Sequence, residues 1–191
     1  MIKRYLFFLL IISASLLSCR EDAFPKPVGY FRITLPEHNY VTFDSTCAMA
    51  MDVPSYSKVE LFEGKSNEDS CWFNVYYPRF DARIYCTYLK VNGNFDILIN
   101  DAYQFAAKHE MKASALRRTM ISHPEKNVEG LLYDIEGETA SQVQFFVTDS
   151  TKNFLRGSLY FNNKNRISIQ YSVIEFVRED ILHMVNSVEW N

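Results

Sequence analysis

Four cysteines are the side chains of this sequence best suited to covalent chemistry, and they stand at positions 19, 47, 71 and 86. Cys19 follows a basic pair, Lys3 and Arg4, then an apolar run over residues 5–17, and small Ser18 directly precedes it. This order is typical of a bacterial lipobox, whose cysteine thiol takes a diacylglycerol before the chain is cut in front of it. We therefore predict lipidation of Cys19. The alternative is an ordinary signal peptide that happens to end near a cysteine.

The first residues read as a secretory leader. Their apolar run covers about thirteen residues, whereas a membrane-spanning helix needs roughly 20. Residues 1–18 are the predicted signal peptide, residues 19–29 a lipidated tether stiffened by Pro25 and Pro27, and residues 30–191 a single domain. Acyl chains on Cys19 hold such a protein on a membrane.

The other three cysteines are an odd number in an exported, oxidising setting. Cys47 shares the apolar phase of its strand-like run with Met49 and Met51, and Cys71 does the same with its own run. We expect a disulfide between Cys47 and Cys71, and a buried free thiol at Cys86. The alternative is that all three are reduced and buried.

No residue set indicates catalysis or a metal. The histidines at positions 38, 109, 123 and 183 are far apart in sequence, without a second ligand at metal-binding spacing. Asp134, Glu136 and Glu138 alternate along a predicted strand, and we interpret them as a solvated face and not as paired carboxylates or a calcium site. Nucleophile-elbow, phosphate-loop and dinucleotide motifs are missing from the sequence. We predict no catalytic residue, no metal and no cofactor.

Charge argues against one class of partner. The chain has 20 Lys and Arg against 23 Asp and Glu, a formal net charge of −3. Nucleic-acid binding needs clustered basic charge, and Arg117-Arg118 is the single adjacent basic pair after the leader. We expect no nucleic-acid partner.

A β-hairpin over residues 139–162 anchors the predicted fold. Apolar residues alternate on both sides of a polar turn at residues 149–153, at positions Val143, Phe145, Val147, Leu155, Gly157, Leu159 and Phe161. Further strands are expected at residues 30–35, 48–53, 58–62, 71–77, 82–89 and 128–135, with a helical or irregular stretch at 114–120. Helices are expected at residues 95–108 and from a capping box, Ser172 with Glu175, to about Ser187.

This order predicts an α+β domain with a largely antiparallel sheet and two main helices, one on each face. It is similar to that of the Mog1/PsbP-like sandwich. Large rings fall opposite the apolar phase of the strands, at Trp72, Tyr76, Tyr85, Phe146 and Tyr160, and Arg156 lies among them. A helix on each face covers such rings; the alternative is an aromatic face left open for a partner. Arg156 then either stacks on these rings or holds an anionic group of the partner.

Several runs resemble the gliding-motility lipoprotein family GldD, in order and spacing over almost the whole chain after Cys19. They are PKPVGYFRI at 25–33, CWFNV at 71–75, His109 with residues 112–113, QFFVTDS at 144–150 and FLRGSLYFN at 154–162. The family tends to have proline where this chain has Ala48 and Ser172, positions that carry no chemistry.

The resemblance implies a non-catalytic envelope component of gliding motility and the linked type IX secretion apparatus. Its implied location is the outer membrane, attached through the lipid anchor, with other gliding and secretion lipoproteins as partners. The surface we expect to meet them contains Trp72, Tyr76, Tyr85, Arg156 and Tyr160. Two alternatives are a lipid-anchored module that binds a small molecule or glycan, and a hydrolase with an unfamiliar site.

Replacing Cys19 with Ala should move the protein from the membrane to the soluble fraction, because the acylated thiol is the predicted attachment. Fractionation and intact-mass measurement check this. Cys86→Ala is the matched control and should stay on the membrane. Unchanged fractionation of the Cys19 variant would contradict the anchor.

Reduction should destabilise the folded domain. Closing the loop between Cys47 and Cys71 contributes on the order of 3 kcal/mol to the free energy of unfolding in the chain-entropy model. Mass mapping without reductant should find Cys86 as the only alkylated cysteine of the three after denaturation. Alkylation of both Cys47 and Cys71 would disprove the disulfide.

Overall fold

The computed structural model describes residues 33–44, 47–62, 64, 66, 69–110, 113–137, 139–162 and 167–191. The side chains of residues 109, 110 and 167–170 are outside this description. The predicted signal peptide, Cys19, the tether and the first residues of the predicted domain also lie outside it. The chain divides by its contacts into Met1–Phe31 and Arg32–Asn191, and the fold below belongs to the second unit.

The described strands and helices follow one another in an α+β order, with runs of consecutive strands interrupted by helices. In chain order they are β1 Tyr40–Asp44, β2 Met49–Pro54, β3 Lys58–Leu61, β4 Ser70–Tyr77, β5 Ala82–Lys90, α2 Phe95–Glu110, β6 Ala113–His123, the short 3-10 helix η2 Pro124–Lys126, β7 Val128–Gly137, β8 Val143–Thr148, β9 Asn153–Phe161, α3 Ile167–Asn186 and β10 Glu189–Trp190. None of the helices in the described ranges is long and apolar enough to cross a membrane.

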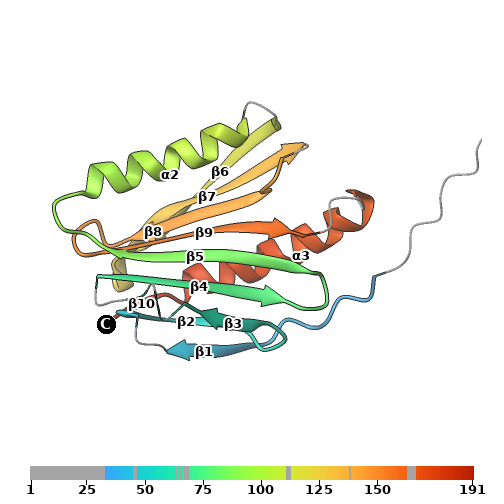
Figure 1. The fold of residues 1–191 in the computed structure, drawn as a ribbon, viewed down its shortest axis with the longest axis horizontal. Coiled ribbons are helices and arrows are strands. Elements are labelled where there is room, and N and C mark those ends of the chain that lie inside the picture. Colours follow the sequence, from blue (N-terminus) through green and yellow to red (C-terminus); the bar gives the residue numbers. More distant parts are fainter. Residues whose placement is uncertain are drawn as a thin grey trace, which may run out of the picture. The chain divides into compact units, whose positions relative to one another are not determined.

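Seven strands form one sheet in the order β3-β4-β5-β9-β8-β7-β6, and β1-β2-β10 form a smaller one. Every strand pair is antiparallel. Helix α2 packs on β6, β7 and β8, whereas α3 packs against β2, β6 and β8 (Figure 1). The α+β class, the antiparallel sheet and the two helices on opposite faces of the large sheet are confirmed.

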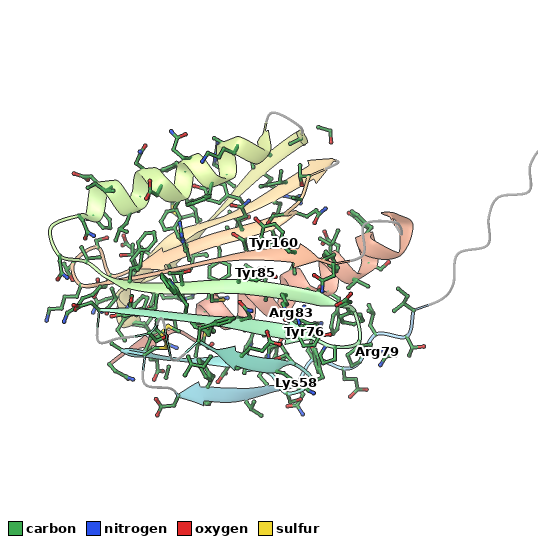
Figure 2. All side chains as sticks on the ribbon, in the orientation of Figure 1. Lys58, Tyr76, Arg79, Arg83, Tyr85 and Tyr160 are labelled. Atoms are coloured by element: carbon green, nitrogen blue, oxygen red, sulfur yellow. A yellow bond between two sulfur atoms is a disulfide. The ribbon has the colours of Figure 1, made fainter. Side chains whose placement is uncertain are left out.

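Helix α2 does not extend over the whole of its face. The labelled side chains Tyr160, Tyr85, Arg83 and Tyr76 lie beyond it, over β9, β5 and β4 (Figure 2). This face of the sheet is therefore half covered.

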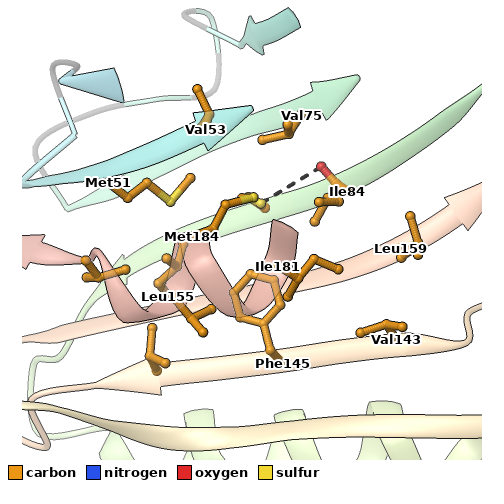
Figure 3. Packing of buried hydrophobic residues seen from close by; sticks show 14 of the residues in the cluster. Met51, Val53, Val75, Ile84, Val143, Phe145, Leu155, Leu159, Ile181 and Met184 are labelled. Atoms are coloured by element: carbon orange, nitrogen blue, oxygen red, sulfur yellow. Dashed lines mark hydrogen bonds between the residues drawn. The ribbon is translucent and has the colours of Figure 1, made fainter. Parts of the chain in front are cut away.

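The main core lies between the large sheet, α3 and β2. Val143, Phe145, Leu155 and Leu159 point from the sheet towards Ile181 of α3, all nearly without solvent contact (Figure 3). Period-two alternation in the hairpin places these side chains on one face, as the sequence predicts. Gly157 is required there, because a side-chain carbon on it would overlap the Phe145 ring.

A second, smaller core lies under α2. Leu98, Ala102 and Ala106 bury one stripe of the helix against Tyr133 and Phe146 of the sheet. Phe105 lies at the edge of this contact and is 43% exposed. Both helices thus bind the sheet through apolar stripes, and α2 buries less.

Two predicted segments near the chain's beginning and middle were wrong. Residues 33–35 are not in a strand; Ile33 and Leu35 pack on the core from a segment without regular secondary structure, and the first strand of the described residues is β1. Residues 114–120 belong to β6, not to a helical or irregular stretch. β6 is an edge strand and largely exposed, so its apolar residues recur every three or four positions and imitate a helix.

The predicted start of the last helix was also wrong. α3 begins at Ile167, so Ser172 and Glu175 lie inside it and do not form a capping box at its N-terminus. The predicted end near Ser187 agrees with Asn186. A serine followed by a glutamate three residues later fits the middle of a helix as well as its start, which explains the error.

Asp134 does not belong to a solvated face. It is 6% exposed and accepts hydrogen bonds from Arg178 of α3, with Nε–Oδ1 2.6 Å and Nη2–Oδ2 3.0 Å. Arg117, the register partner of Asp134 on β6, has its Nε 3.3 Å from the same Oδ2. The hydrogen bond to Asp134 raises the pKa of Arg178. The carboxylate therefore joins β6, β7 and α3 in the folded domain.

The structure joins Cys47 and Cys71 by a disulfide, with their Cα atoms 5.7 Å apart. Cys86 is a buried free thiol on the same core face, and burial raises its pKa far above the ordinary value. The disulfide connects the segment before β2 to the start of β4, so it fastens the small sheet to the large one.

A fully buried carboxylate holds the N-terminal segment on α3. Asp180 accepts hydrogen bonds from Tyr56 Oη at 2.8 Å, from Tyr40 Oη at 3.0 Å and from His38 Nδ1 at 2.8 Å. The Tyr40 ring also stacks on His183, with ring centroids 3.6 Å apart. Two histidines that are distant in sequence thus meet around one tyrosine. Burial removes the tyrosine hydroxyls from water and is the largest reason why the pKa of both tyrosines lies well above the ordinary value. The negative charge of Asp180 and the hydrogen bonds to it raise the pKa further.

Replacing Tyr56 with Phe should lower the free energy of unfolding at neutral pH by about 1–3 kcal/mol, because buried Asp180 loses a donor. Above about pH 10 the unfolded chain ionises its tyrosines while folded Tyr56 keeps its proton, so wild-type stability falls as the pH rises. The variant has no ionisable group at position 56, so the difference in free energy of unfolding between wild type and variant should become smaller as the pH rises. Urea unfolding from neutral to alkaline pH measures this.

Tyr171→Phe is the matched control, because its ring is 67% exposed on α3, and its unfolding midpoint at neutral pH should equal that of the wild type. A gap for Tyr56→Phe that stays constant in alkali would contradict the assigned role of Asp180.

Candidate functional site

The uncovered half of the α2 side of the large sheet is the candidate site, and we call it the open face. It is formed by strands β3, β4, β5 and β9, with α2 standing at its border over β8 and β7 (Figure 1). Strand register brings its side chains into rows that run across the sheet. Three such rows matter.

The first row is basic and aromatic. Lys58, Tyr76, Arg83 and Tyr160 are successive register partners across β3, β4, β5 and β9 (Figure 2). The Arg83 guanidinium lies 3.9 Å from the Tyr76 ring centroid, and its Nε lies 3.3 Å from Glu60 Oε2. Stacking and the ion pair hold this arginine flat on the sheet.

The second row runs from the open face under α2. Its register partners are Asn74, Tyr85, Ser158, Gln144 and Tyr133. Tyr85 is 45% exposed and meets Tyr160 edge to face, with ring centroids 5.5 Å apart. Tyr133 and Gln144 are buried at the other end of the row. The row therefore passes from solvent into the second core.

The third row contains the arginine of the predicted surface. Trp72, Thr87, Arg156 and Phe146 are register partners across β4, β5, β9 and β8. The Arg156 guanidinium lies 4.5 Å from the ring centroid of Phe105, which reaches over from α2. Burial lowers the pKa of Arg156, and no described carboxylate pairs with it.

A cavity of about 590 Å³ lies where the second and third rows meet α2. Its wall combines aromatic rings with hydrogen-bond donors: Tyr85, Phe105, Phe146, Tyr160, Tyr133, Gln144, Arg156 and Ser158. Burial raises the pKa of Tyr133 to about 12, so its hydroxyl keeps its proton at neutral pH. Clefts of roughly 300–1,000 Å³ with apolar walls and few polar groups are typical of ligand sites.

The described cavity wall offers aromatic rings and hydrogen-bonding groups. Among the described lining residues there is no carboxylate and no histidine, and hence no paired acid and base. Within the described parts of the chain, no group of three His, Cys, Asp or Glu side chains is arranged to hold a metal ion.

The structure brings three of the five predicted surface residues into one cavity: Tyr85, Arg156 and Tyr160. Trp72 and Tyr76 lie on the same open face, outside the cavity wall. Phe146 belongs to the same wall but is 5% exposed under α2. The sequence left two alternatives for this face of the sheet, cover by a helix or an open aromatic surface. The part over β6, β7 and β8 is covered by α2, and the part over β3, β4, β5 and β9 is open.

Sequence reasoning did not select Gln144, Tyr133 or Phe105 as site residues. Gln144 had a usable signal, because it is a polar residue in the outward phase of an otherwise apolar strand. Tyr133 alternates with Leu131 and Ile135 and therefore looks like a core residue. Phe105 reaches the cavity only because α2 crosses β8, which no local pattern shows.

Comparisons with known proteins found a family model and a solved structure that match this chain. A solved structure, the solution structure of cyanobacterial PsbP (CyanoP) from Synechocystis sp. PCC 6803, is similar at 11% sequence identity and a TM-score of 0.44, covering 86% of this chain and 99% of that one. That similarity is too low to carry an argument. Among curated proteins, no sequence matches this chain.

The model of one protein family, described as gliding motility lipoprotein GldD, matches residues 20–190. The match starts directly after Cys19 and ends one residue before the last, so it includes every described strand and helix. The resemblance seen in the sequence is thereby confirmed, and the chain belongs to the gliding motility lipoprotein GldD family.

Proposed function

We propose that this lipoprotein is a non-catalytic component of gliding motility and the linked type IX secretion machinery. Lipidated Cys19 holds it on the outer membrane, and the domain acts through contacts with other gliding and secretion lipoproteins. The observation that carries the proposal is the family match over residues 20–190, which begins next to the lipidated cysteine.

The open face supports a role in protein contact. It presents Trp72, Tyr76, Tyr85, Arg83 and Tyr160 on a sheet surface that no described helix covers. Tyrosine, tryptophan and arginine are enriched at protein interfaces because they combine large apolar areas with hydrogen-bonding ends. Arg83 and Tyr76 are held in place by their mutual stacking, so less side-chain entropy is lost when a partner binds.

A second candidate function is a lipid-anchored module that binds a small molecule or glycan. The cavity beside α2 favours it, since its aromatic rings and donors suit one enclosed ligand more than a flat partner surface. The two candidates use neighbouring parts of the same face. A hydrolase is disfavoured by the described cavity wall, which has neither a carboxylate nor a histidine.

Deleting the gene should abolish colony spreading and reduce secretion of outer-surface adhesins, and the wild-type copy should restore both. A Tyr85→Asp copy should fail to restore spreading, because it places a charge at the centre of the open face. Tyr171→Asp is the matched control on α3, where a tyrosine that is more exposed than Tyr85 is changed, and it should restore spreading. Surface-spreading assays and immunoblots of the secreted fraction measure these outcomes.

Normal spreading of the deletion strain would contradict the motility function. Normal spreading of the Tyr85→Asp strain at wild-type protein levels would instead contradict the assignment of the partner surface to the open face.

A further inference from the structure

We propose that the cavity between α2 and strands β5, β9 and β8 binds an organic carboxylate with a flat apolar body. Arg156, Gln144 and Tyr133 receive the carboxylate, and aromatic rings enclose the body. The inference rests on the second candidate function above and names its ligand class; it does not depend on the gliding function.

Arg156 supplies the charge. Its guanidinium is half-buried and stacked on Phe105, and among the described residues no carboxylate forms an ion pair with it. Asp101 of α2 forms no ion pair with Arg156; this exposed carboxylate acts on the guanidinium only by long-range electrostatic attraction. By contrast, Arg83 and Arg178 each pair with a carboxylate of the chain. A partly desolvated arginine without a partner at a cavity wall favours an anion from outside.

Gln144 and Tyr133 supply two further donors. The residues are 4% and 1% exposed, and Gln144 Nε2 and Tyr133 Oη find no hydrogen-bond partner among the described residues. The two residues are register partners on adjacent strands, and both belong to the cavity wall. Buried polar groups are nearly always satisfied, so two neighbouring orphans at one cavity require an explanation. A bound acceptor group satisfies both.

The composition of the wall selects the ligand class. Arg156, Gln144, Tyr133 and Ser158 all offer N–H or O–H donors, and the described wall has no carboxylate to repel an anion. A planar carboxylate matches the fork of a guanidinium through two parallel hydrogen bonds. The hydroxyl and amide groups of this wall also accept hydrogen bonds from a neutral sugar, but such a ligand leaves the charge of Arg156 without a counterion.

The aromatic part of the wall selects the body of the ligand. Phe146 forms the buried end and Tyr85 and Tyr160 the solvent end, with Phe105 on the α2 side. Four rings around one space favour a ring or another flat apolar group over a flexible polar chain. Such chemistry occurs in a free aromatic acid and in the C-terminal aromatic residue of a peptide.

Binding is tested with full-length protein in lipid nanodiscs, with empty nanodiscs as the blank. The probes are indole-3-acetate against its neutral analogue indole-3-acetamide, and a short peptide ending in Phe, with a free against an amidated C-terminus. Calorimetry should give dissociation constants for the acids that are at least about tenfold lower than those for the amides, because a charge-assisted hydrogen bond usually contributes that much. Tighter binding of the free-acid peptide than of indole-3-acetate identifies a chain terminus as the source; the reverse order identifies a free acid.

Variants place the binding in the cavity. Arg156→Gln should weaken binding of the better acid about tenfold or more, and Arg156→Lys should restore part of the loss because it keeps the charge. Tyr133→Phe should weaken binding several-fold while the melting temperature without ligand stays equal or rises, since the deleted hydroxyl has no partner in the free protein. Tyr77→Phe is the matched control, because Tyr77 is buried on the opposite face of the sheet and should leave the affinity unchanged.

Three results would overturn the inference. They are equal binding of acids and amides, no binding of either acid at millimolar concentration, and wild-type affinity in Arg156→Gln. Any of them leaves the gliding function intact, because that function is judged by colony spreading alone.

Discussion

The contact between α3 and the large sheet is the constraint on which the rest of the domain depends. The sheet buries Phe145, Leu155 and Leu159 against Ile181, and Gly157 leaves the space that the Phe145 ring occupies. Once α3 takes that face, every outward-phase residue of β3, β4, β5 and β9 must lie on the other side. The composition of the open face is thus a consequence of the core, through the period-two geometry of the strands.

Length decides why the other face is only half covered. α2 has 16 residues, about 24 Å at 1.5 Å per residue, and it lies over β6, β7 and β8. Strands in a sheet are roughly 4.8 Å apart, so one helix cannot shield seven of them. The border of α2 is where Phe105, Arg156 and Tyr85 meet, and a cavity forms at that border because the helix ends its cover there. The site therefore exists because α2 covers only part of this face of the large sheet.

Polar contacts decide how the outer elements are held. Asp134 joins β6 and β7 to α3 through two arginines, and Asp180 joins His38, Tyr40 and Tyr56 to the same helix. Both carboxylates are buried and fully supplied with donors, so losing one donor leaves charge without compensation. The disulfide adds a covalent link between the small sheet and β4. The open face contains a different kind of polar group: at its border, Arg156, Gln144 and Tyr133 have no such partners within the described domain.

Local pattern alone determined much of this protein. Alternation located the hairpin of β8 and β9 and the pair of β4 and β5, stripes located α2 and most of α3, and the lipobox and the quoted runs pointed to the family. These features are readable because burial of one side repeats every two residues in a strand and every three to four in a helix. They were misread where the pattern of burial differs from the one typical of the secondary structure, in edge strand β6 and in the irregular segment at Ile33 and Leu35.

Only the tertiary structure decided what meets what. Asp134 looked like a solvated side chain until α3 brought Arg178 to it, and His38 and His183 met only around Tyr40. The cavity takes Tyr133 and Gln144 from adjacent strands, Arg156 from a third and Phe105 from a helix. A single sequence carries periodicity along the chain but no record of which distant segments cross, since crossing is set by how all apolar faces are covered together. For that reason the sequence determined the faces, and the packing of the two helices determined the site.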